Sequence, residues 1–422
     1  MHEMRDSGIE WVGAIPNHWR VSKIKQIVRW KSVKGQPDLP VLSLYRDYGV
    51  IPKDSRDDNH NVTSLDTSGY KVVEHGDLVI NKMKAWQGSL AVSEYNGIVS
   101  PAYHICKITS ENICKKYLHY LLRDASYLPE YMRLSTGLRV GQWDLSFDDF
   151  KNIPFLVPPL AEQERIVAFL DAQCAEIDAV LEKTRASIEE YKKLKQAVIT
   201  QAVTKGIRGD RPMKDSGIEW IGEIPAEWDV LKLVAHTSML TPMRDRPENL
   251  DGPIPWVRIE DFEGKYIESS KAGLGVSMKT VKEMNLKVYP VGTILCTSSC
   301  IMGKCAIVSR ELVSNQRFIG IIPDRTTDKT YLYYLMTSNA ERMNFLSTGA
   351  LQANLSRSAF EHLKVQFPPY SEQQEIAAYL DDKCEKIDEL ILKKQQYLTE
   401  IENYKKSLIY EYVTGKKEVH PL

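Results

Sequence analysis

Two stretches of this chain occur twice, and the duplication constrains its fold more than any other feature. The segment DSGIEWVGAIPNHW begins at Asp6, and DSGIEWIGEIPAEW begins at Asp215, 209 residues later. A longer pair consists of PPLAEQERIVAFLDAQCAEIDAVLEK from Pro158 and PPYSEQQEIAAYLDDKCEKIDELILK from Pro368, 210 residues later. Repetition at a fixed period indicates that one structural unit is built twice. We therefore expect two halves, each with a Trp-rich segment, a divergent block and a long helix.

The second repeated stretch predicts the long helices. Each copy follows a Pro-Pro pair, which commonly precedes a helix, and Ser371 is a plausible N-cap for the second copy. Apolar residues then alternate at spacings of four and three over about four heptads, a pattern typical of a coiled coil. About 40 residues of helix span about 60 Å, more than the width of a small domain, which disfavours the alternative of ordinary amphipathic helices on a globular core. The predicted seam consists of Leu170, Ile177, Leu181, Ile188, Tyr191 and Val198 in the first helix, and Leu380, Ile387, Ile391, Leu398, Ile401 and Leu408 in the second.

The repeats divide the chain into six parts. Between them, β-branched runs punctuated by glycine alternate with short amphipathic stretches that end at glycine, which indicates mixed, strand-rich domains. The first of these domains and its repeated segment are assigned to residues 1–157, the first long helix to 158–204, a Gly- and Pro-containing linker to 205–212, the second domain to 213–367, the second long helix to 368–414 and a tail to 415–422. Two equal halves of this kind are expected to be related by a pseudo-two-fold axis.

Composition and charge exclude several classes of protein. Hydrophobic residues make up 43% of the chain and charged residues 26%, as in ordinary globular proteins. No run of eighteen apolar residues and no basic-then-apolar leader is present, so we expect a cytoplasmic protein that does not enter a membrane. The net charge of −1 conceals a pattern, because residues 20–157 and residues 230–367 each carry four more Lys and Arg than Asp and Glu. Such an excess is also common on a solvated face, so it does not identify a partner by itself.

Motifs for catalysis and for metal binding are missing. Seven widely spaced cysteines give no disulfide framework. Cys296, Cys300 and Cys305 lie close together, but without a CxxC pair they are better interpreted as small residues in a buried strand or turn than as zinc ligands. The stretch FPPY begins with Phe367, which cannot accept the hydrogen bonds that the first residue of an adenine-methyltransferase motif must accept. The phosphate-binding pattern GxxxxGK[ST] is also missing. We therefore expect a protein that is not an enzyme and binds no metal or cofactor itself.

The order of these features points to a known family. SGIEWxGxIPxxW, the run STG…QxxLS…F…PP…EQxxIxxxLD and a long helix occur in the same order in both halves. Over essentially its whole length the chain resembles the specificity subunit of type I restriction–modification enzymes. The resemblance implies an α+β fold, with two pseudo-two-fold related mixed α/β target-recognition domains separated by two long antiparallel coiled-coil helices.

The same resemblance implies a function and a set of partners. Each domain is expected to read one half of an interrupted sequence in double-stranded DNA, and the helices are expected to set the spacing and dock the methylation subunits. Two methylation subunits and the restriction subunits assemble around such a chain, which serves host defence through DNA methylation and cleavage. S-adenosylmethionine, ATP and Mg²⁺ are then expected on these partner subunits.

Candidate DNA-reading residues carry cationic, amide or aromatic side chains on predicted tips and helix ends. Arg and Lys read guanine, and Asn and Gln read adenine, in the major groove. Gln352 matches Gln142 at an offset of 210, so this pair fits a role in positioning the backbone better than a role in reading different bases. The candidates are Lys82, Lys84, Trp86, Gln87, Arg139, Gln142 and Trp143 in the first block, and Arg258, Lys304, Asn315, Gln316, Arg317, Gln352, Asn354 and Arg357 in the second.

Alternative interpretations apply to these residues and to the function. Many of the candidates could instead satisfy backbone groups in turns or lie in solvent. Trp11, Trp19, Trp220 and Trp228 are expected to pack the frame or to contact a methylation subunit. The chain could also be the specificity module of another restriction–methylation system, or a protein-interaction scaffold whose basic blocks bind acidic proteins. Divergent blocks within a duplicated frame favour DNA over the scaffold.

Overall fold

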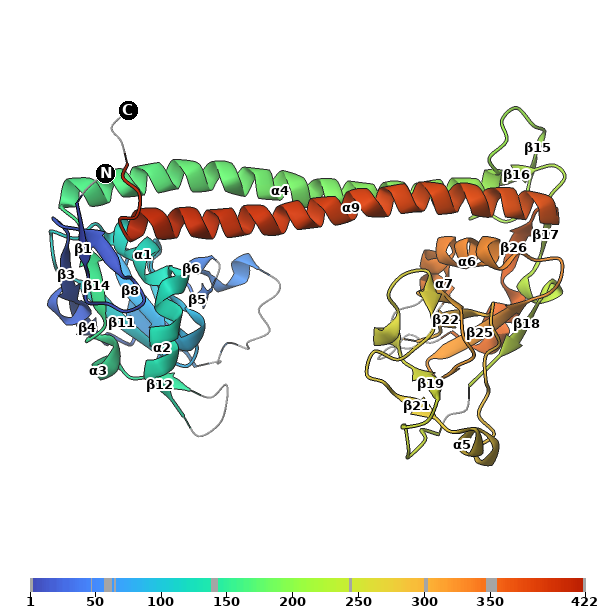
Figure 1. Ribbon diagram of the computed structural model, residues 1–422, viewed down its shortest axis with the longest axis horizontal. Coiled ribbons are helices and arrows are strands. Elements are labelled where there is room, and N and C mark those ends of the chain that lie inside the picture. Colours follow the sequence, from blue (N-terminus) through green and yellow to red (C-terminus); the bar gives the residue numbers. More distant parts are fainter. Residues whose placement is uncertain are drawn as a thin grey trace. The chain divides into compact units, whose positions relative to one another are not determined.

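The chain folds into two compact units. Unit 1 comprises residues 1–185 and 396–422, and unit 2 comprises residues 186–395. Helix α4 (Leu160–Lys205) begins in unit 1 and ends in unit 2, whereas α9 (Tyr370–Val413) begins in unit 2 and ends in unit 1. The computed structural model in Figure 1 describes residues 3–46, 48–56, 63, 66–137, 143–242, 245–299, 303–346 and 355–419.

Unit 1 is built on a four-stranded antiparallel sheet with the strand order β4–β11–β8–β9. Side chains alternate between its two faces, as the pleat of a strand requires. Leu78 and Ile80 of β8 are buried in the core that also contains α1 and Trp19, whereas Val79 is buried in a second core. The elements before α4 are β1 (Met4–Asp6), β2 (Ala14–Pro16), β3 (Arg20–Lys23), β4 (Val28–Lys31), β5 (Leu42–Tyr45), β6 (Gly49–Pro52), β7 (Lys71–Val73), β8 (Asp77–Asn81), β9 (Leu90–Val92), β10 (Gly97–Val99), β11 (Tyr103–Ile108), α1 (Lys115–Arg123), α2 (Leu128–Leu134), β12 (Ser135–Thr136), β13 (Asp144–Leu145), α3 (Phe147–Phe150) and β14 (Pro154–Val157).

Unit 2 contains a five-stranded sheet, β18–β25–β22–β23–β20, whose first four strands correspond in order to those of unit 1. Strand β20 is added at one edge, parallel to β23. Ile294 and Cys296 of β22 face the core that contains α6 and Trp228, and Leu295 faces a second core. The elements between the long helices are β15 (Met213–Asp215), β16 (Glu223–Pro225), β17 (Asp229–Lys232), β18 (Thr237–Leu240), β19 (Ile254–Val257), β20 (Tyr266–Ile267), β21 (Gly275–Val276), α5 (Met278–Glu283), β22 (Ile294–Thr297), β23 (Cys305–Val308), β24 (Val313–Ser314), β25 (Phe318–Pro323), α6 (Lys329–Ser338), α7 (Ala340–Leu346), α8 (Arg357–His362) and β26 (Lys364–Phe367).

The repeated Trp-rich segment anchors the start of a long helix in each unit. Trp19 is 1% exposed, and its indole N–H donates to Oε1 of Glu162, in the first turn of α4, at 3.0 Å. Trp228 is fully buried and donates to Oε2 of Glu372, in the first turn of α9, at 3.0 Å. A carboxylate is also favoured at this end of a helix because the helix dipole is positive there. The expectation that these two tryptophans pack the frame is confirmed.

The first tryptophan of each copy is less covered. Trp11 is half-buried and packs edge-on against Tyr127, with the ring centroids 6.1 Å apart. Trp220 is 44% exposed, and the guanidinium carbon of Arg342 lies 3.9 Å from the centroid of its ring. The two copies of the segment therefore differ in the surface that they leave accessible.

The glutamine that follows each of these glutamates joins the long helix to the rest of its unit. Gln163 is fully buried, accepts a hydrogen bond from the N–H of Cys114 at 2.8 Å and donates to two backbone carbonyl groups. Gln373, 2% exposed, likewise accepts from the N–H of Asp328 at 2.8 Å and donates to two carbonyl groups. The repeated Glu-Gln pair thus joins each long helix to its unit, because the glutamate binds a tryptophan and the glutamine binds backbone groups.

Helix α9 begins before the serine that was expected to cap it. Tyr370 is its first residue, and the N–H groups of Glu372 and Gln373 donate to the carbonyl oxygen of Pro369 at 2.9 and 3.0 Å. Ser371 lies inside the first turn and is exposed, so its prediction as the N-cap is wrong. The Pro-Pro pair supplies the backbone acceptor at this helix end.

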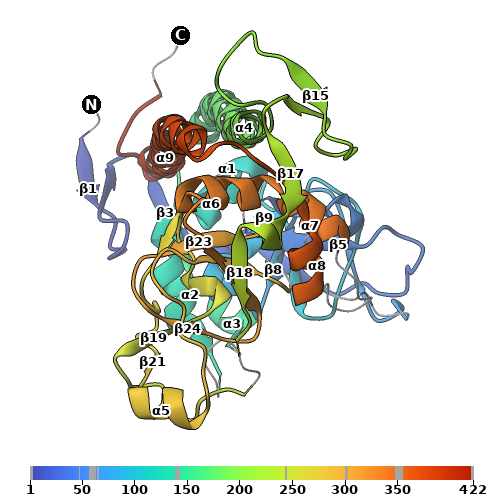
Figure 2. The same cartoon turned by 90° about the vertical axis from the view of Figure 1, so that its right-hand side faces the viewer.

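The long helices pair along the predicted seam. All of the predicted seam residues are buried or half-buried. In unit 1, Asp178 of α4 accepts from Nζ of Lys405 at 2.6 Å, and Arg185 donates to Glu402 at 2.6 Å. Because the partner number falls as the α4 number rises, the helices are antiparallel, as Figure 1 also shows. Figure 2 looks along the two helices and shows them side by side.

Unit 2 repeats one of these ion pairs with the helices exchanged. Here Nζ of Lys195, in α4, donates to Oδ2 of Asp388, in α9, at 2.6 Å. Lys195 and Lys405 are 210 residues apart, and so are Asp178 and Asp388. A contact in which two copies of a surface exchange roles is the signature of an isologous pairing.

The end of each long helix completes the core of the other half of the sequence. Leu408 and Val413 of α9 are buried in the unit 1 core, and Ile199 and Val203 of α4 are buried in the unit 2 core. The helices are therefore not only a coiled coil, because their ends also pack as ordinary amphipathic helices on a globular core.

A glycine after each long helix lets the chain pass the buried tryptophan. Gly206 and Gly415 have φ values of 73° and 72°, a left-handed conformation that favours glycine. A Cβ atom at Gly415 would lie 2.5 Å from Pro16 and 3.0 Å from Trp19. Beyond this turn, Nζ of Lys416 donates to the carbonyl oxygen of Val12 at 2.9 Å. The end of α9 therefore closes against the first repeated segment.

One expectation about the cysteines is corrected. Cys296 and Cys305 occupy paired positions on β22 and β23 and form a disulfide, although the odd count and the spacing of the cysteines gave no disulfide framework. Their interpretation as buried strand residues is confirmed, because both are less than 10% exposed. Cys300 lies outside the described residues.

The buried glutamines give a stability prediction. Gln373→Ala removes three hydrogen bonds and leaves the N–H of Asp328 without its acceptor, so we expect the free energy of unfolding of unit 2 to fall by about 2–4 kcal/mol. The matched control is Gln374→Ala, an exposed position in the same helical turn, for which the expected change is within about 0.5 kcal/mol. Urea unfolding of the full chain measures both, and equal midpoints for the two variants would contradict the assigned role.

Candidate nucleic-acid interface

The same backbone junction occurs in both units, at the place where the candidate residues gather. In unit 1 the N–H of Leu145 donates to the carbonyl oxygen of Lys82 at 2.9 Å, just after strand β8. In unit 2 the N–H of Leu355 donates to the carbonyl oxygen of Ser298 at 2.9 Å, just after strand β22. Leu145 and Leu355 are 210 residues apart. The repeated LS motif thus meets equivalent strand ends.

A serine fixes the chain after each junction. Ser146 accepts a hydrogen bond from the N–H of Asp149 and caps α3, and Ser356 accepts from the N–H of Ala359 and caps α8. Such caps stabilise helices by about 1 kcal/mol. The repeated sequence therefore builds a scaffold of backbone contacts, and the residues around it are free to differ.

In unit 1 the first candidates lie on the turn between β8 and β9. These two strands pair antiparallel, so the predicted hairpin tip is confirmed. Lys84 and Gln87 are exposed at this tip, whereas Lys82 and Trp86 are half-buried. Trp86 meets Trp143 edge-on, with the ring centroids 5.3 Å apart. Arg139 and Gln142 lie outside the described residues.

Further side chains extend this tip along the sheet. Lys82 pairs with Asp144, with Nζ 2.8 Å from Oδ2. On β11, His104 pairs in the sheet with Ile80 of β8, and its ring contacts that of Phe147, with the centroids 6.0 Å apart. Burial lowers the pKa of His104, so its imidazole is neutral at pH 7.

Two lysines near this region have opposite electrostatic surroundings. Burial lowers the pKa of Lys71, and the nearby Lys34 and Lys82 lower it further. Burial also acts to lower the pKa of Lys31, but the carboxylates of Glu74 and Asp77 raise it above its ordinary value. Lys71 therefore lies in a cluster of positive charge, whereas Lys31 is neutralised.

In unit 2 a second set of candidates follows β24. Asn315 accepts a hydrogen bond from the N–H of Arg317 through its side chain at 3.1 Å, which forms a tight turn. Gln316 and Arg317 are exposed on this turn. The carbonyl oxygen of Arg317 accepts from the N–H of Ser298 at 2.9 Å, so the turn borders the junction. The N–H of Asn315 also bonds to the carbonyl oxygen of Val257, next to Arg258, at 3.4 Å.

The remaining unit 2 candidates are already engaged by neighbouring groups. Arg258 is half-buried, and its Nη1 lies 3.0 Å from Oε1 of Glu260. Arg357 begins α8 and donates from Nε to Glu361 at 2.7 Å. Lys304 is exposed, with Nζ 5.9 Å from the ring centroid of Phe262. Gln352 and Asn354 lie outside the described residues.

Sequence reasoning missed several residues of this region. Lys34 and Lys71 form a β-bridge although 37 positions separate them, and His104 joins the cluster from a third segment. Trp30 is 52% exposed and stacks on Phe147, with the centroids 6.2 Å apart. An exposed tryptophan on a strand was the one available signal, because the lysine contacts depend on strand pairing that the local sequence does not specify.

Comparison with known proteins identifies the family. The model of the type I restriction modification DNA specificity domain matches residues 16–190 and again residues 229–403. The chain belongs to this specificity-domain family. Each match begins near the buried tryptophan of a repeated segment and ends in a long helix, so one copy of the family domain coincides with one repeat.

Relatives of the specificity family align over different lengths. The MjaIX specificity subunit of Methanocaldococcus jannaschii is 36% identical over 176 residues, which cover 39% of this chain and 40% of that relative. The putative MjaX specificity subunit of the same organism is 24% identical over 97% of this chain and 96% of its own length. The EcoKI specificity subunit of Escherichia coli is 21% identical over 71% of this chain and 65% of the relative.

Solved structures share the fold of this specificity-family chain. A chain from a structural study of complex assembly and conformational transition in the type I R-M system has a TM-score of 0.73 at 14% identity, with 96% of this chain and 99% of that chain aligned. The HsdS subunit of Thermoanaerobacter tengcongensis has a TM-score of 0.50 at 15% identity over 96% and 98% of the two chains. The predicted fold class, two mixed α/β domains with two long antiparallel helices, is confirmed.

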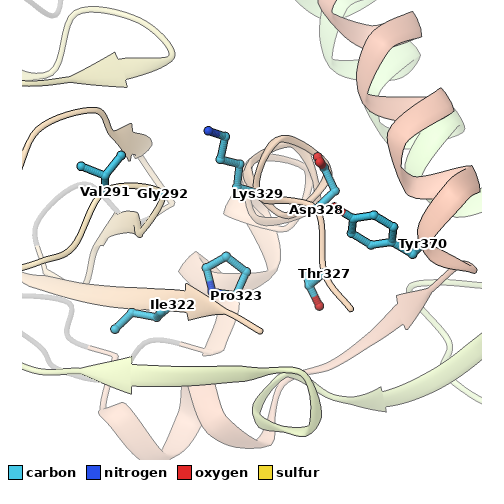
Figure 3. A pocket seen from close by; sticks show the side chains of 8 residues that line it. All are labelled: Val291, Gly292, Ile322, Pro323, Thr327, Asp328, Lys329 and Tyr370. Carbon is cyan, nitrogen blue, oxygen red and sulfur yellow. The ribbon is translucent and has the colours of Figure 1, made fainter. Parts of the chain in front are cut away.

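A pocket in unit 2 of this specificity-family chain is lined by none of the candidate residues. Figure 3 shows a pocket of about 300 Å³ in unit 2, lined by the end of β25, the start of α6 and the first residue of α9. Its carboxylate, Asp328, is occupied by the N–H groups of Thr330 and Tyr331, which it caps at 2.8 and 2.9 Å.

The described residues contain neither a membrane-spanning helix nor a metal-binding cluster. None of their helices is long and apolar enough to span a membrane. Within the same residues, no group of three or more His, Cys, Asp or Glu side chains is arranged to hold a metal ion.

Proposed function

We propose that this chain is the DNA-specificity subunit of a type I restriction–modification complex, in which each unit reads one half of an interrupted sequence in double-stranded DNA. The observation that carries the proposal is the junction between the strand end and the LS motif. The same backbone hydrogen bond occurs in both units, from Leu145 to Lys82 and from Leu355 to Ser298, but the surrounding side chains differ. A shared scaffold with different tips fits two readers of different sequences.

The chemistry of the tips supports this division. Unit 1 presents the ammonium group of Lys84, the amide of Gln87 and partly exposed tryptophan rings. Unit 2 presents the amide of Gln316 and the guanidinium of Arg317. Lysine and arginine bind guanine or phosphate, and glutamine binds adenine, so both tips carry groups suited to a major groove.

Membership of the specificity family supports a set of partners for this chain. Two methylation subunits and the restriction subunits complete the proposed cytoplasmic complex, and they carry S-adenosylmethionine, ATP and Mg²⁺. The long helices, each of which takes part in both units, dock the methylation subunits and set the spacing between the half-sites. In this proposal the chain itself performs no chemical step.

The absence of catalysis is tested with the purified full chain. Incubated with labelled S-adenosylmethionine and duplex DNA that contains the target, the chain alone is expected to transfer no label and to leave the DNA uncut. Label is expected on adenine once the methylation subunits are added, which is the positive control. Reproducible labelling by the chain alone would overturn the claim.

The division of labour is tested by exchange of one block. Replacing residues 20–157 with the matching block of a relative is expected to change one half of the methylated sequence and to leave the other half intact. Methylation mapping of cells that carry the exchanged chain and its partner subunits measures this. A change in both halves would contradict independent reading, and a chain that binds acidic proteins but no DNA would instead be the scaffold.

A single substitution tests the unit 2 tip. Arg317→Ala is expected to weaken binding of target DNA about 5- to 150-fold, the loss of a bidentate contact of about 1–3 kcal/mol, and to relax only the half-site that unit 2 reads. The matched control is Arg325→Ala, an exposed arginine beyond the opposite end of β25. If both variants bind target DNA equally well, Arg317 does not read a base.

A further inference from the structure

Lys71 in unit 1 is a buried lysine whose charge is not balanced by a carboxylate. It is 8% exposed, and its Nζ donates to the carbonyl oxygen of Tyr103 at 2.5 Å. Within the described ranges, no carboxylate forms an ion pair with it. Among the described residues, the charged groups that act on the pKa of Lys71 are lysines, because Lys34 and Lys82 both lower it, and the backbone of Lys34 bridges to that of Lys71. Burying an unpaired charge is unfavourable, so the arrangement needs an explanation.

The same unit contains the arrangement that would be expected of a purely structural lysine. Lys31 is also largely covered, and its Nζ lies 2.9 Å from Oε2 of Glu74 and 2.9 Å from Oδ2 of Asp77. Two carboxylates therefore surround one ammonium group there. Carboxylates thus balance the charge of Lys31, whereas no carboxylate among the described residues balances the charge of Lys71.

The position of this charge matters for the proposed function. Tyr103, which binds the ammonium group of Lys71, is paired in the sheet with Asn81, the last residue of β8. The next residue, Lys82, opens the hairpin tip and bonds through its N–H to the carbonyl oxygen of Ala102 at 3.3 Å. The lysine cluster therefore lies at the end of the sheet from which the candidate DNA-reading tip projects.

We propose that Lys34 and Lys82 bind the phosphate backbone of duplex DNA, next to the tip that carries Lys84 and Gln87. The buried charge of Lys71 lies behind them and strengthens the positive potential of this site. This inference rests on the proposed function and adds residues that position the DNA rather than read its bases. Among the described residues, these three lysines have one partner carboxylate, Asp144, which leaves a net charge of two that an anion can balance. Phosphate contacts of this kind set the register of a protein on the duplex without carrying sequence information.

The test measures how salt affects binding of the full chain to two duplexes, one with the target sequence and one without it. Lys34→Gln and Lys71→Gln are each expected to weaken binding of both duplexes by the same factor. Lys34→Gln is also expected to reduce the slope of log K against log salt by about one, because one phosphate contact releases about one counterion. Lys71→Gln removes a buried charge behind the site and no direct contact, so its slope is expected to change less. Lys34 is exposed and without an ion pair in the described part of the chain, so its substitution does not endanger folding.

The matched control is Lys107→Gln, which removes the same charge from an exposed position at the opposite end of β11. It is expected to leave the slope unchanged, and Lys34→Arg is expected to restore the slope that Lys34→Gln loses. Thermal melting checks that the Lys71→Gln variant is folded. If that variant is unfolded, the salt dependence of Lys34→Gln alone tests the inference.

Three results would overturn the inference. One is a slope for Lys34→Gln equal to that of Lys107→Gln, and another is a loss confined to the target duplex, which would indicate base reading. In both cases the unaltered chain still binds its target, so the proposed function stands while this inference fails. If the unaltered chain, assembled with its methylation subunits, binds neither duplex, the proposed function fails and this inference fails with it.

Discussion

The hydrogen bond between a buried tryptophan and the first-turn glutamate of a long helix is the contact on which the rest of the structure depends. Trp19 and Trp228 each donate to such a glutamate at 3.0 Å from within a hydrophobic core. The first turn of the helix positions the glutamate carboxylate, and the domain packs over that first turn. Losing the glutamate would leave the buried indole N–H without the acceptor that it has here, which is the costly outcome for a hydrogen bond. Each half of the sequence therefore contains both the tryptophan and the glutamate that it bonds to.

Much of the architecture was predictable because its signals are local and repeated. The seam of residues such as Leu170 and Leu380 follows from a spacing of four and three, and burial of the seam depends on little else. The position of Ser371 was predicted wrongly because a Pro-Pro pair offers both a helix start and a carbonyl acceptor, and the competing acceptor of Pro369 is not visible as a side-chain pattern. The disulfide between Cys296 and Cys305 depends on strand register, which their spacing alone does not fix.

The candidate interface was predictable only in part. The tip with Lys84 and Gln87 follows from two β-branched runs around a polar turn, and the structure forms it. The approach of Lys34 to Lys71 joins strands that are distant in sequence, and no local pattern predicts which strands become neighbours. Candidate residues are thus easiest to predict where they share a turn, and hardest where the sheet brings them together.

The way α9 closes against the first repeated segment bears on the order in which the protein is made. Unit 2 is a continuous stretch of chain, from 186 to 395, whereas unit 1 also needs Leu408 and Val413 for its core and Lys416 for the contact with Val12. Bringing together residues about 400 positions apart costs more conformational entropy than bringing together residues that are close in sequence. During synthesis all of unit 2 is made before the last part of α9, from residue 396 onward, which belongs to unit 1. The half of the protein that is translated first therefore cannot complete its core until the end of α9 has been made.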